Sequence, residues 1–499
     1  MSSKEFGLFI DGKWQPAKGG KTAESINPAT EEPWATVAVA DRDDVDKAVA
    51  AAKRSYDAGV WRNKPKQERA EILNKICNAI FERQDELAAA EVQDGGGTIR
   101  KATAADIPGG AQTFMQFSQA LLAQTEEEEF EEQVPVPSRN IVRREPIGVC
   151  AGIIPWNFPF VMASWKIAPA LAARNSVIIK PASNTPVTAL LLAEICSQAG
   201  VPDGVVNVIS GPGGMVGEAL ATHPDVGKVA FTGSTEVGRR IMQLASGTIK
   251  KVTLELGGKS PNIILDDADL DSAAMGALFG TFFHQGQICE SGTRVLVPEP
   301  LYDGFVERMV EGSKRIALGD TLDPATTMGP LVSKAQLDTV SGYVDIGRKE
   351  GADCVIGGSC SASMDRGYYF EPTIFRNVDN KMRIAQEEIF GPVVSVIPYN
   401  GDAAAVGIAN DSMYGLGGAV WSKDTEHALR IARRIQTGTV WINDYHLINV
   451  RFPFGGYKQS GVGRELGPWG LDAYQEIKHI HVGQSAPASD KIYMAMLFN

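Results

Sequence analysis

Between residues 147 and 245, short apolar runs alternate with segments whose apolar residues recur every three or four positions. Short apolar runs bounded by turns predict buried strands, and the three- and four-residue spacing predicts helices. The predicted strands are 147–154, 176–180, 205–209 and 226–232, and the predicted helices are 161–173, 186–199, 216–221 and 235–245. This alternation predicts a parallel, doubly wound sheet.

A second alternating block follows, and a helical region precedes the first block. Residues 44–97 have helical spacing, with one helix beginning at Val45 and another spanning 68–91. In the second block the predicted helices are 270–285, 301–316, 336–350 and 426–435, and the predicted strands are 294–297 and 393–399. The fold class is therefore α/β, with two doubly wound domains and a ligand crevice expected between them.

Length and charge narrow the classes of protein. The chain has 499 residues, which favours two or three domains. Its formal net charge of −12 argues against nucleic-acid binding and against an anionic membrane surface. No apolar run reaches the roughly 18 residues that span a bilayer, and the N-terminus lacks a signal-peptide core. We expect a cytoplasmic protein.

Cysteine and histidine spacing gives no sign of a metal site. The six cysteines form no CxxC pair, and the six histidines are scattered. His479 and His481 share one face of a predicted strand, but two histidines alone are weak grounds for a metal. We expect no bound metal.

Cys289 lies in the stretch FFHQGQICESGTR (282–294), between a predicted helix end and a predicted strand. A thiolate is a strong nucleophile, and a cysteine in a loop can reach a substrate. On this stretch alone the alternative is an inert buried cysteine, which behaves as a small apolar residue.

Two further polar residues stand in apolar surroundings. Glu255 lies inside the apolar stretch LELGGKSP (254–261). Burial of a carboxylate without a partner raises its pKa, which suits a general base; pairing with a lysine is the alternative. Asn157 follows the predicted strand 147–154, where its amide can donate to a developing oxyanion or simply belong to a turn before a proline.

Two glycine-rich turns follow predicted strands, FTGSTEVG (231–238) and GPGG (211–214). The first ends a strand and begins a helix, whose free backbone N–H groups suit a pyrophosphate. Neither turn matches the strict GxGxxG fingerprint, so each alone is a weak signal of nucleotide binding.

Taken together, these stretches resemble the aldehyde dehydrogenase superfamily from about Leu8 to His481. The ordered motifs are WNFP, KPAS (180–183), FTGSTEVG, LELGGKSPN, FFHQGQIC, EEIFGPV (387–393) and PFGGYKQSGVGRELG (453–467). The resemblance implies an NAD(P)-dependent enzyme that oxidises an aldehyde to the free carboxylic acid. CoA-acylating relatives usually lack a glutamate at the position of Glu255, so a CoA thioester is not the expected product.

The resemblance also implies five roles in catalysis. Cys289 is the expected nucleophile, which forms a thiohemiacetal and then a thioester. Glu255 is the expected base that activates water for hydrolysis. The Asn157 amide and the Cys289 backbone N–H are the expected oxyanion hole, and Lys166 and Glu465 are expected to assist proton transfer from Glu255.

The implied cofactor site uses the same motifs. Lys180 is expected to hold the adenosine ribose, Glu388 the nicotinamide ribose, and Phe390 to lie beside the nicotinamide. Ser183 stands where strongly NAD-selective relatives carry glutamate, so we expect NAD as the main cofactor with NADP accepted. The other residues expected at the cofactor are Ile153, Pro155, Trp156, Gly213, Phe231, Gly233, Ser234, Val237, Leu256, Gly257 and Gln336.

The implied substrate tunnel is mostly apolar, which favours uncharged aliphatic or aromatic aldehydes. Glu290 would disfavour anionic aldehydes if it points at the thiol, and Trp165 replaces the arginine of succinate-semialdehyde relatives. Arg451 is close enough in sequence to approach the tunnel. The alternatives are a betaine-aldehyde or semialdehyde specialist, and a non-catalytic family member. The expected tunnel residues, for which plain core packing is the other interpretation, are Phe158, Met162, Trp165, Ile288, Glu290, Leu447 and Phe454.

We expect three regions: a cofactor domain of residues 1–122 and 146–256, a catalytic domain of residues 257–460, and an oligomerisation arm and tail of residues 123–145 and 461–499. The acidic run 126–132 by itself favours a solvated loop. The resemblance instead implies that 126–145 and 473–482 pair across subunits of a homodimer or homotetramer. The tail after residue 484 ends in apolar residues, so we expect it to dock on a neighbouring subunit or near its own substrate entrance.

Overall fold

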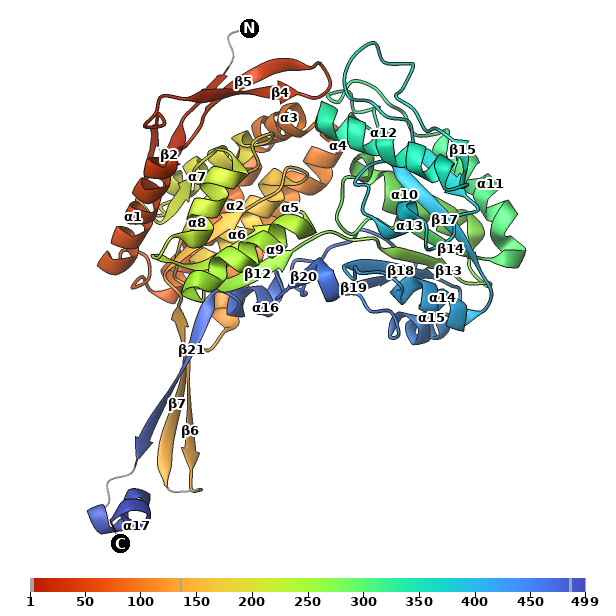
Figure 1. Ribbon diagram of the computed structural model, residues 1–499. Helices are drawn as coiled ribbons and strands as arrows, with labels where there is room; N and C mark the ends of the chain where they lie inside the picture. The colour runs from red at the N-terminus through yellow and green to blue at the C-terminus, as the bar shows by residue number, and fades with distance from the viewer. Residues whose placement is uncertain (1–3, 135–136, 484–486, 499) are drawn as a thin grey trace.

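The computed structural model describes residues 4–134, 137–483 and 487–498. They form two sheet-centred bodies side by side, with an arm that projects from one of them (Figure 1). Small parts of the expected arm and tail, residues 135–136, 484–486 and 499, lie outside the described residues.

The first body is built on an eight-stranded sheet with the order β20-β12-β11-β8-β9-β10-β2-β3. Its five central strands are mutually parallel, as the alternating pattern predicts. They are β8 (Val149–Ile153), β9 (Ser176–Lys180), β10 (Val206–Val208), β11 (Val226–Thr232) and β12 (Lys251–Glu255). The antiparallel strands at the sheet edges are β2 (Leu8–Ile10), β3 (Lys13–Gln15) and β20 (Gly461–Val462).

Both faces of this sheet are covered, which explains the run of consecutive apolar residues in the middle of β9. In β9, Val177 and Ile179 pack into one core and Ile178 into the other. Because successive side chains point to opposite faces, only a strand buried on both sides is apolar at every position. The helices contributing to the two cores are α1 (Arg42–Ala58), α2 (Lys66–Glu82), α3 (Gln84–Gly95), α5 (Ile107–Ala123), α6 (Pro159–Ala172), α7 (Val187–Gln198), α8 (Glu218–Thr222) and α9 (Thr235–Ala245).

The second body has a seven-stranded sheet with the order β15-β16-β17-β14-β13-β18-β19. Only β15 (Asp353–Ile356) runs antiparallel to its neighbour. The parallel strands are β13 (Pro261–Ile264), β14 (Arg294–Pro298), β16 (Thr373–Arg376), β17 (Val393–Tyr399), β18 (Gly417–Trp421) and β19 (Thr439–Ile442). Its longer helices are α10 (Leu270–Phe282), α11 (Tyr302–Ser313), α12 (Lys334–Lys349), α14 (Asp402–Asn410) and α15 (Thr425–Ala432). The predicted α/β class with two doubly wound bodies is confirmed.

The arm is a three-stranded antiparallel sheet with the order β21-β7-β6 (Figure 1). Its strands are β6 (Glu127–Glu132), β7 (Ser138–Pro146) and β21 (Gln475–Gly483). The interpretation of 126–132 as a solvated loop is therefore wrong. Arginines on β7 offset the acidic run, because Arg143 lies 3.3 Å from Glu127 and Arg144 lies 2.7 Å from Glu128.

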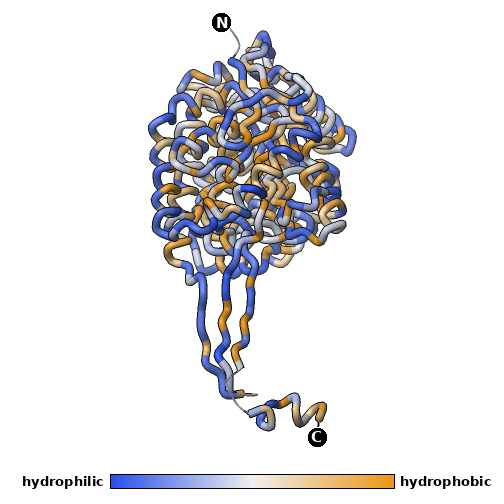
Figure 2. The backbone as a smooth tube through the Cα atoms, turned by 90° about the vertical axis from the view of Figure 1, so that its left-hand side faces the viewer, coloured by the Kyte–Doolittle hydropathy of each residue, from blue (hydrophilic) through white to orange (hydrophobic). Residues whose placement is uncertain are grey.

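Helix α17 (Ile492–Leu497) lies beyond the far end of the arm in both views (Figures 1 and 2). Its apolar side chains face solvent, since Met496 is 73% exposed and Leu497 is 77% exposed. Docking near its own substrate entrance is therefore wrong for this structure, because the arm carries the tail away from both sheets.

Three details differ from the sequence prediction. The predicted helix 68–91 is two helices, α2 and α3, interrupted at Arg83, whose φ of −106° lies outside the helical range. The predicted helix 216–221 begins as a π-helix at 213–217. Strand β20, from the segment assigned to the arm and tail, pairs with β12 in the first sheet; the domain boundaries otherwise stay predictions. Among the described residues, the helices are too short or too polar to cross a membrane.

Candidate active site

A cavity of about 590 Å³ lies where the two bodies face each other. Its walls come from residues 155–158 after β8, 232–234 after β11, 255–257 at the end of β12, and 288–290 before β14. The chain adds β9 and β10 on one side of β8 and then returns to place β11 on the other. Ligands of doubly wound sheets bind at such a switch point, beside the carboxyl ends of the strands.

Cys289 is presented to this cavity by a strained turn. Between α10 and Cys289, three consecutive residues have positive φ: 52° at His284, 58° at Gln285 and 70° at Gly286. For residues with a Cβ this conformation costs energy, and such strain gathers at functional sites. At Gly286 a Cβ would lie only 2.2 Å from the Gly391 carbonyl oxygen, so the turn also needs a glycine.

The expected oxyanion donors lie beside the thiol. The Asn157 amide donates to the Gln287 carbonyl at 2.8 Å, which ties the residue to the segment that carries Cys289. An amide nitrogen has two hydrogens, so a second donor remains. The Cys289 backbone N–H donates to no acceptor within the described part of the chain. Both groups line or border the cavity, as an oxyanion hole requires.

Glu255 is 2% exposed, and neither of its carboxylate oxygens has a hydrogen-bond partner among the described residues. Burial, and then the charge of Glu465, raise the pKa of Glu255 well above its ordinary value. The alternative of a lysine partner is wrong for this residue, because Lys166 pairs with Glu465 at 2.6 Å and with Thr232 at 2.7 Å. The Lys166–Glu465 pair lies close enough to influence Glu255 without a direct hydrogen bond.

Glu290 points at the nucleophile. The Cys289 thiol donates to the Glu290 carboxylate at 3.2 Å, and the other oxygen of Glu290 lies 3.2 Å from His446 Nδ1. The orientation of Glu290, which the sequence left open, is therefore the one that disfavours a thiolate and anionic substrates. His446 was not identified from the sequence, since it lies far from Cys289 along the chain.

Nine of the expected cofactor residues line the cavity. Glu388 accepts a hydrogen bond from the Gly258 N–H at 3.0 Å, and burial raises its pKa to about 7. The rings of Trp156 and Phe390 meet edge to face at 5.2 Å, and the Gln336 amide fixes the Phe390 carbonyl at 2.8 Å. The nine are Pro155, Trp156, Gly233, Ser234, Leu256, Gly257, Gln336, Glu388 and Phe390.

The other six expected cofactor residues lie outside this cavity. Lys180 ends β9, next to β8, and its ammonium forms no hydrogen bond or ion pair with the described residues. Burial lowers the pKa of Lys180 to about 8. Ser183 donates its hydroxyl to the Gly211 carbonyl at 3.2 Å, so that donor is already used. The six are Ile153, Lys180, Ser183, Gly213, Phe231 and Val237.

These features fit a dinucleotide. The buried Lys180 ammonium at the end of β9 has no hydrogen-bond partner among the described residues and suits an anionic group of such a ligand. At the start of α9, Ser234 accepts from the Val237 N–H, and the N–H groups before it suit another anionic group. No atom lies within 4 Å of a Cβ built at Gly213 or Gly214, which leaves room beside the backbone.

All seven residues expected in the tunnel line this cavity, and their contact with a substrate stays a prediction. Trp165 and Phe454 meet at 5.3 Å between ring centroids. Arg451 is exposed and is not among the lining residues, so it does not approach the tunnel. Sequence reasoning missed a wall formed by residues 104–112, because it includes a π-helical turn (102–106) that no sequence pattern marks.

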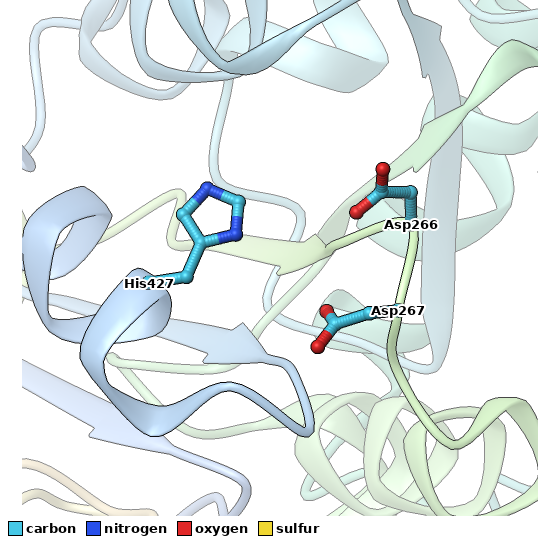
Figure 3. Close-up of side chains that lie close together, drawn as sticks. All are labelled: Asp266, Asp267 and His427. Atoms are coloured by element: carbon cyan, nitrogen blue, oxygen red, sulfur yellow. The ribbon is translucent and has the colours of Figure 1, made fainter.

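A group with metal-ligand chemistry lies away from this cavity (Figure 3). Asp266 and Asp267 follow β13, His427 lies on α15, and one ligand atom of each falls within 4.8 Å of the others. His427 is already hydrogen-bonded to Asp402 at 2.7 Å, and Asp267 accepts from Ser422 at 2.7 Å. These contacts already engage His427 and Asp267 within the protein, and the expectation of no bound metal stays a prediction.

Known proteins match this chain over nearly all its length. The model of the aldehyde dehydrogenase family matches residues 14–480. The betaine aldehyde dehydrogenase of Bacillus subtilis (strain 168) is 46% identical over 477 residues, which cover 95% of this chain and 96% of that protein. The human mitochondrial aldehyde dehydrogenase is 44% identical over 480 residues, covering 95% of this chain and 91% of that protein.

Solved structures agree with the sequence comparisons. A crystal structure of betaine aldehyde dehydrogenase from Staphylococcus aureus in complex with NAD+ has a TM-score of 0.94 and 39% identity, covering 97% of this chain and 96% of that one. An NAD+ complex of aldehyde dehydrogenase from Bacillus cereus has a TM-score of 0.94 and 42% identity, covering 97% of both chains. The chain belongs to the aldehyde dehydrogenase family.

Proposed function

We propose that the protein oxidises uncharged aliphatic or aromatic aldehydes to carboxylic acids with NAD. The observation that carries this proposal is the cavity itself. It gathers a cysteine, an amide donor and an unpaired buried carboxylate at one end of a mostly apolar tunnel. A non-catalytic family member would not need this arrangement.

Acylation uses Cys289 and Asn157. The Cys289 thiol releases its proton to solvent, the thiolate sulfur attacks the aldehyde carbon, and the carbonyl oxygen becomes an oxyanion facing the Asn157 amide and the Cys289 backbone N–H. Each preorganised donor typically contributes about 3 kcal/mol to the stability of the transition state. Bound NAD supplies the acceptor for the hydride that leaves the substrate carbon, and a thioester remains on Cys289.

Hydrolysis of the thioester uses Glu255. Its raised pKa makes it a stronger base than an ordinary carboxylate, and its unpaired oxygens leave it free to take a proton from water. The resulting hydroxide attacks the thioester carbon, and the sulfur leaves. Lys166 and Glu465 serve as positioning residues that set the charge around Glu255.

The walls of the tunnel argue for an uncharged substrate. Glu255, Glu290 and Glu388 disfavour an anionic aldehyde, and Trp165 stands where an anion-binding arginine would be needed. A second candidate is a cationic substrate such as betaine aldehyde, favoured by the aromatic pair Trp165 and Phe454. His446 already offsets Glu290, which makes the uncharged class the first choice.

NAD is proposed as the main cofactor and NADP as a second one. Residues present at the carboxyl ends of β8, β9 and β11 fit a dinucleotide, and relatives of known structure bind NAD+. Ser183 carries no charge that would repel a 2′-phosphate. Its hydroxyl must leave the Gly211 carbonyl to donate to that phosphate, which limits the expected use of NADP.

The arm and the tail support a homodimer or homotetramer. The outer strand β21 leaves apolar side chains exposed, such as Ile477 at 69%, and α17 presents further apolar residues to solvent. Burying such an edge and such a helix against a second subunit removes both from water. The cytoplasmic location predicted from the sequence remains part of this proposal.

The first experiment is an absorbance assay at the reduced-nicotinamide band with NAD and then NADP. The panel is hexanal, benzaldehyde, betaine aldehyde and succinate semialdehyde, and Cys289→Ala is the matched control. We expect reduction with hexanal or benzaldehyde that disappears in Cys289→Ala. Faster reduction with betaine aldehyde than with either would favour the second candidate. No reduction by folded wild-type protein with any substrate would contradict the proposal.

A further inference from the structure

The nucleophile of this protein rests on a buried ion pair. The Cys289 thiol donates to one oxygen of Glu290, and His446 Nδ1 meets the other, each at 3.2 Å. The side chains of His446 and Glu290 are 3% and 5% exposed. A charge pair so well shielded from water acts on its neighbours far more strongly than a surface pair does.

Several contacts fix this ion pair in place. His446 Nε2 faces the Gly280 carbonyl at 3.1 Å, so both ring nitrogens face acceptors. A doubly protonated imidazolium is the form that donates to both. The Tyr445 hydroxyl donates to the Glu290 carbonyl at 2.8 Å, and Gly417 leaves space for the Glu290 side chain, since a Cβ there would lie 2.9 Å from the Cβ of Glu290.

The backbone of His446 has a strained conformation. Its φ is +60°, in the left-handed region that residues other than glycine rarely occupy. The surrounding rings of Phe279, Phe283 and Tyr445 hold the imidazole at centroid distances of 5.4, 5.8 and 4.8 Å. The surrounding rings therefore hold His446 against Glu290 in a strained backbone conformation.

The charges that act most strongly on the sulfur are carboxylates. Glu290 touches the thiol directly, and Glu255 and Glu388 act on it through space. No lysine, arginine or histidine in the described part of the chain forms a hydrogen bond with the sulfur. Among the described residues, the Glu290 carboxylate is the acceptor of the thiol hydrogen.

We propose that Glu290, held by His446, is a positioning residue that keeps the Cys289 nucleophile protonated in the resting enzyme. The proposal rests on the proposed function only in taking Cys289 as the nucleophile. Because the thiolate, rather than the thiol, is oxidised and alkylated, the arrangement protects the sulfur while no aldehyde is bound.

The electrostatics agree with the contacts. Burial, and then the charge and the hydrogen bond of Glu290, raise the pKa of the Cys289 thiol well above its ordinary value. Burial also acts to raise the pKa of Glu290, but the hydrogen bond and charge of His446, together with the hydrogen bonds of the Cys289 thiol and the backbone, outweigh it and the pKa is lowered. His446 therefore keeps Glu290 ionised, and the ionised carboxylate keeps the thiol protonated.

The test is the rate at which iodoacetamide alkylates Cys289, measured against pH without cofactor or aldehyde. The modified Cys289 peptide is quantified by mass spectrometry, which separates it from the other five cysteines. Glu290→Gln removes the charge next to the sulfur, so we expect the profile to move to lower pH by about one unit and the rate near neutral pH to rise about tenfold. His446→Gln removes the cation that keeps Glu290 ionised, so we expect a smaller shift, also to lower pH.

The double variant distinguishes this proposal from a general disturbance of the site. Because His446 acts through Glu290, Glu290→Gln with His446→Gln should shift the profile no further than Glu290→Gln alone, whereas independent disturbances would add. Glu131→Gln, on the exposed arm strand β6, is the matched control for loss of one carboxylate and is expected to change nothing. An unshifted Glu290→Gln profile, a His446→Gln shift to higher pH, or additive shifts in the double variant would overturn the proposal. If Glu290→Gln does not fold, the His446→Gln profile decides, since only a shift to lower pH agrees with the proposal.

The proposed function can fail separately. Loss of nicotinamide reduction in Cys289→Ala reports on catalysis, whereas the alkylation profiles report only on the thiol. If wild-type protein reduces no nicotinamide but the two variants show the expected shifts to lower pH, the proposed function is contradicted and the Glu290–His446 arrangement still stands.

Discussion

Two buried carboxylates, Glu255 and Glu290, line the same cavity as Cys289, and their surroundings differ. Glu255 comes from the end of β12 and has no partner, and burial raises its pKa. Glu290 precedes β14 and is equally buried, yet His446 reverses the effect of burial and its pKa is lowered. Burial alone therefore does not decide what a carboxylate does in an active site. In our proposal, Glu255, which has no cationic partner, takes part in proton transfer, and Glu290, which His446 pairs, holds the thiol hydrogen of Cys289.

The largest expected effect comes from replacing Glu255, the carboxylate that has no hydrogen-bond partner among the described residues. Glu255→Gln keeps the shape but removes the base, so turnover should fall by about 10²- to 10⁴-fold. Acylation should continue, giving a single burst of reduced nicotinamide followed by a slow steady state. Stopped-flow absorbance measures both phases. Loss of the burst itself would show that Glu255 acts before hydrolysis and would contradict the separate roles proposed for Glu255 and Glu290.

Asn157, an uncharged residue that lines the same cavity, tests whether acylation and thioester hydrolysis are separate steps. Asn157→Ala removes an oxyanion donor, so the burst rate should fall by about 10²- to 10³-fold. Because Asn157 also binds the Gln287 carbonyl, the alkylation profile of Cys289 serves as the control for an intact loop. An unchanged burst rate with slower thioester hydrolysis would contradict the assignment of this amide to acylation.

The pH dependence of thioester hydrolysis sharpens the comparison next. Below its raised pKa, Glu255 is protonated and accepts no proton, so the hydrolysis rate should rise about tenfold per pH unit and level off above that pKa. Steady-state turnover of wild type across the acid range measures this slope. Glu255→Gln should show no slope, and a slope that survives in the variant would point to another base.

The smallest expected effect concerns substrate charge. Glu290→Gln removes one carboxylate from the tunnel, but His446 already offsets it, so anionic aldehydes should gain only about two- to fivefold. The readout is the ratio of kcat/KM for succinate semialdehyde to that for hexanal, because a ratio cancels any change in the nucleophile. A gain of 100-fold would mean that Glu290 is not compensated by His446.

Much of the fold followed from the apolar pattern, since strands buried on both faces are apolar at each position. The strand β6 did not, because an acidic segment becomes a strand only when arginines on β7 lie opposite it, and that pairing is tertiary. The residues expected in the substrate tunnel came from their positions relative to the family motifs. His446 was missed because its contact with Glu290 spans more than 150 residues of sequence and depends on a left-handed backbone that no spacing predicts.

The short strand β20 ties the base to the end of the chain. Residues 461–462 close the outer edge of β12 opposite Glu255, and Glu465 supplies the partner of Lys166. Until those residues leave the ribosome, the edge of β12 is open and the Lys166 ammonium lacks its carboxylate. Vectorial synthesis therefore completes this active site only after residue 465 has been made, and a nascent chain released earlier carries Cys289 without the Lys166–Glu465 pair that sets the charge around Glu255.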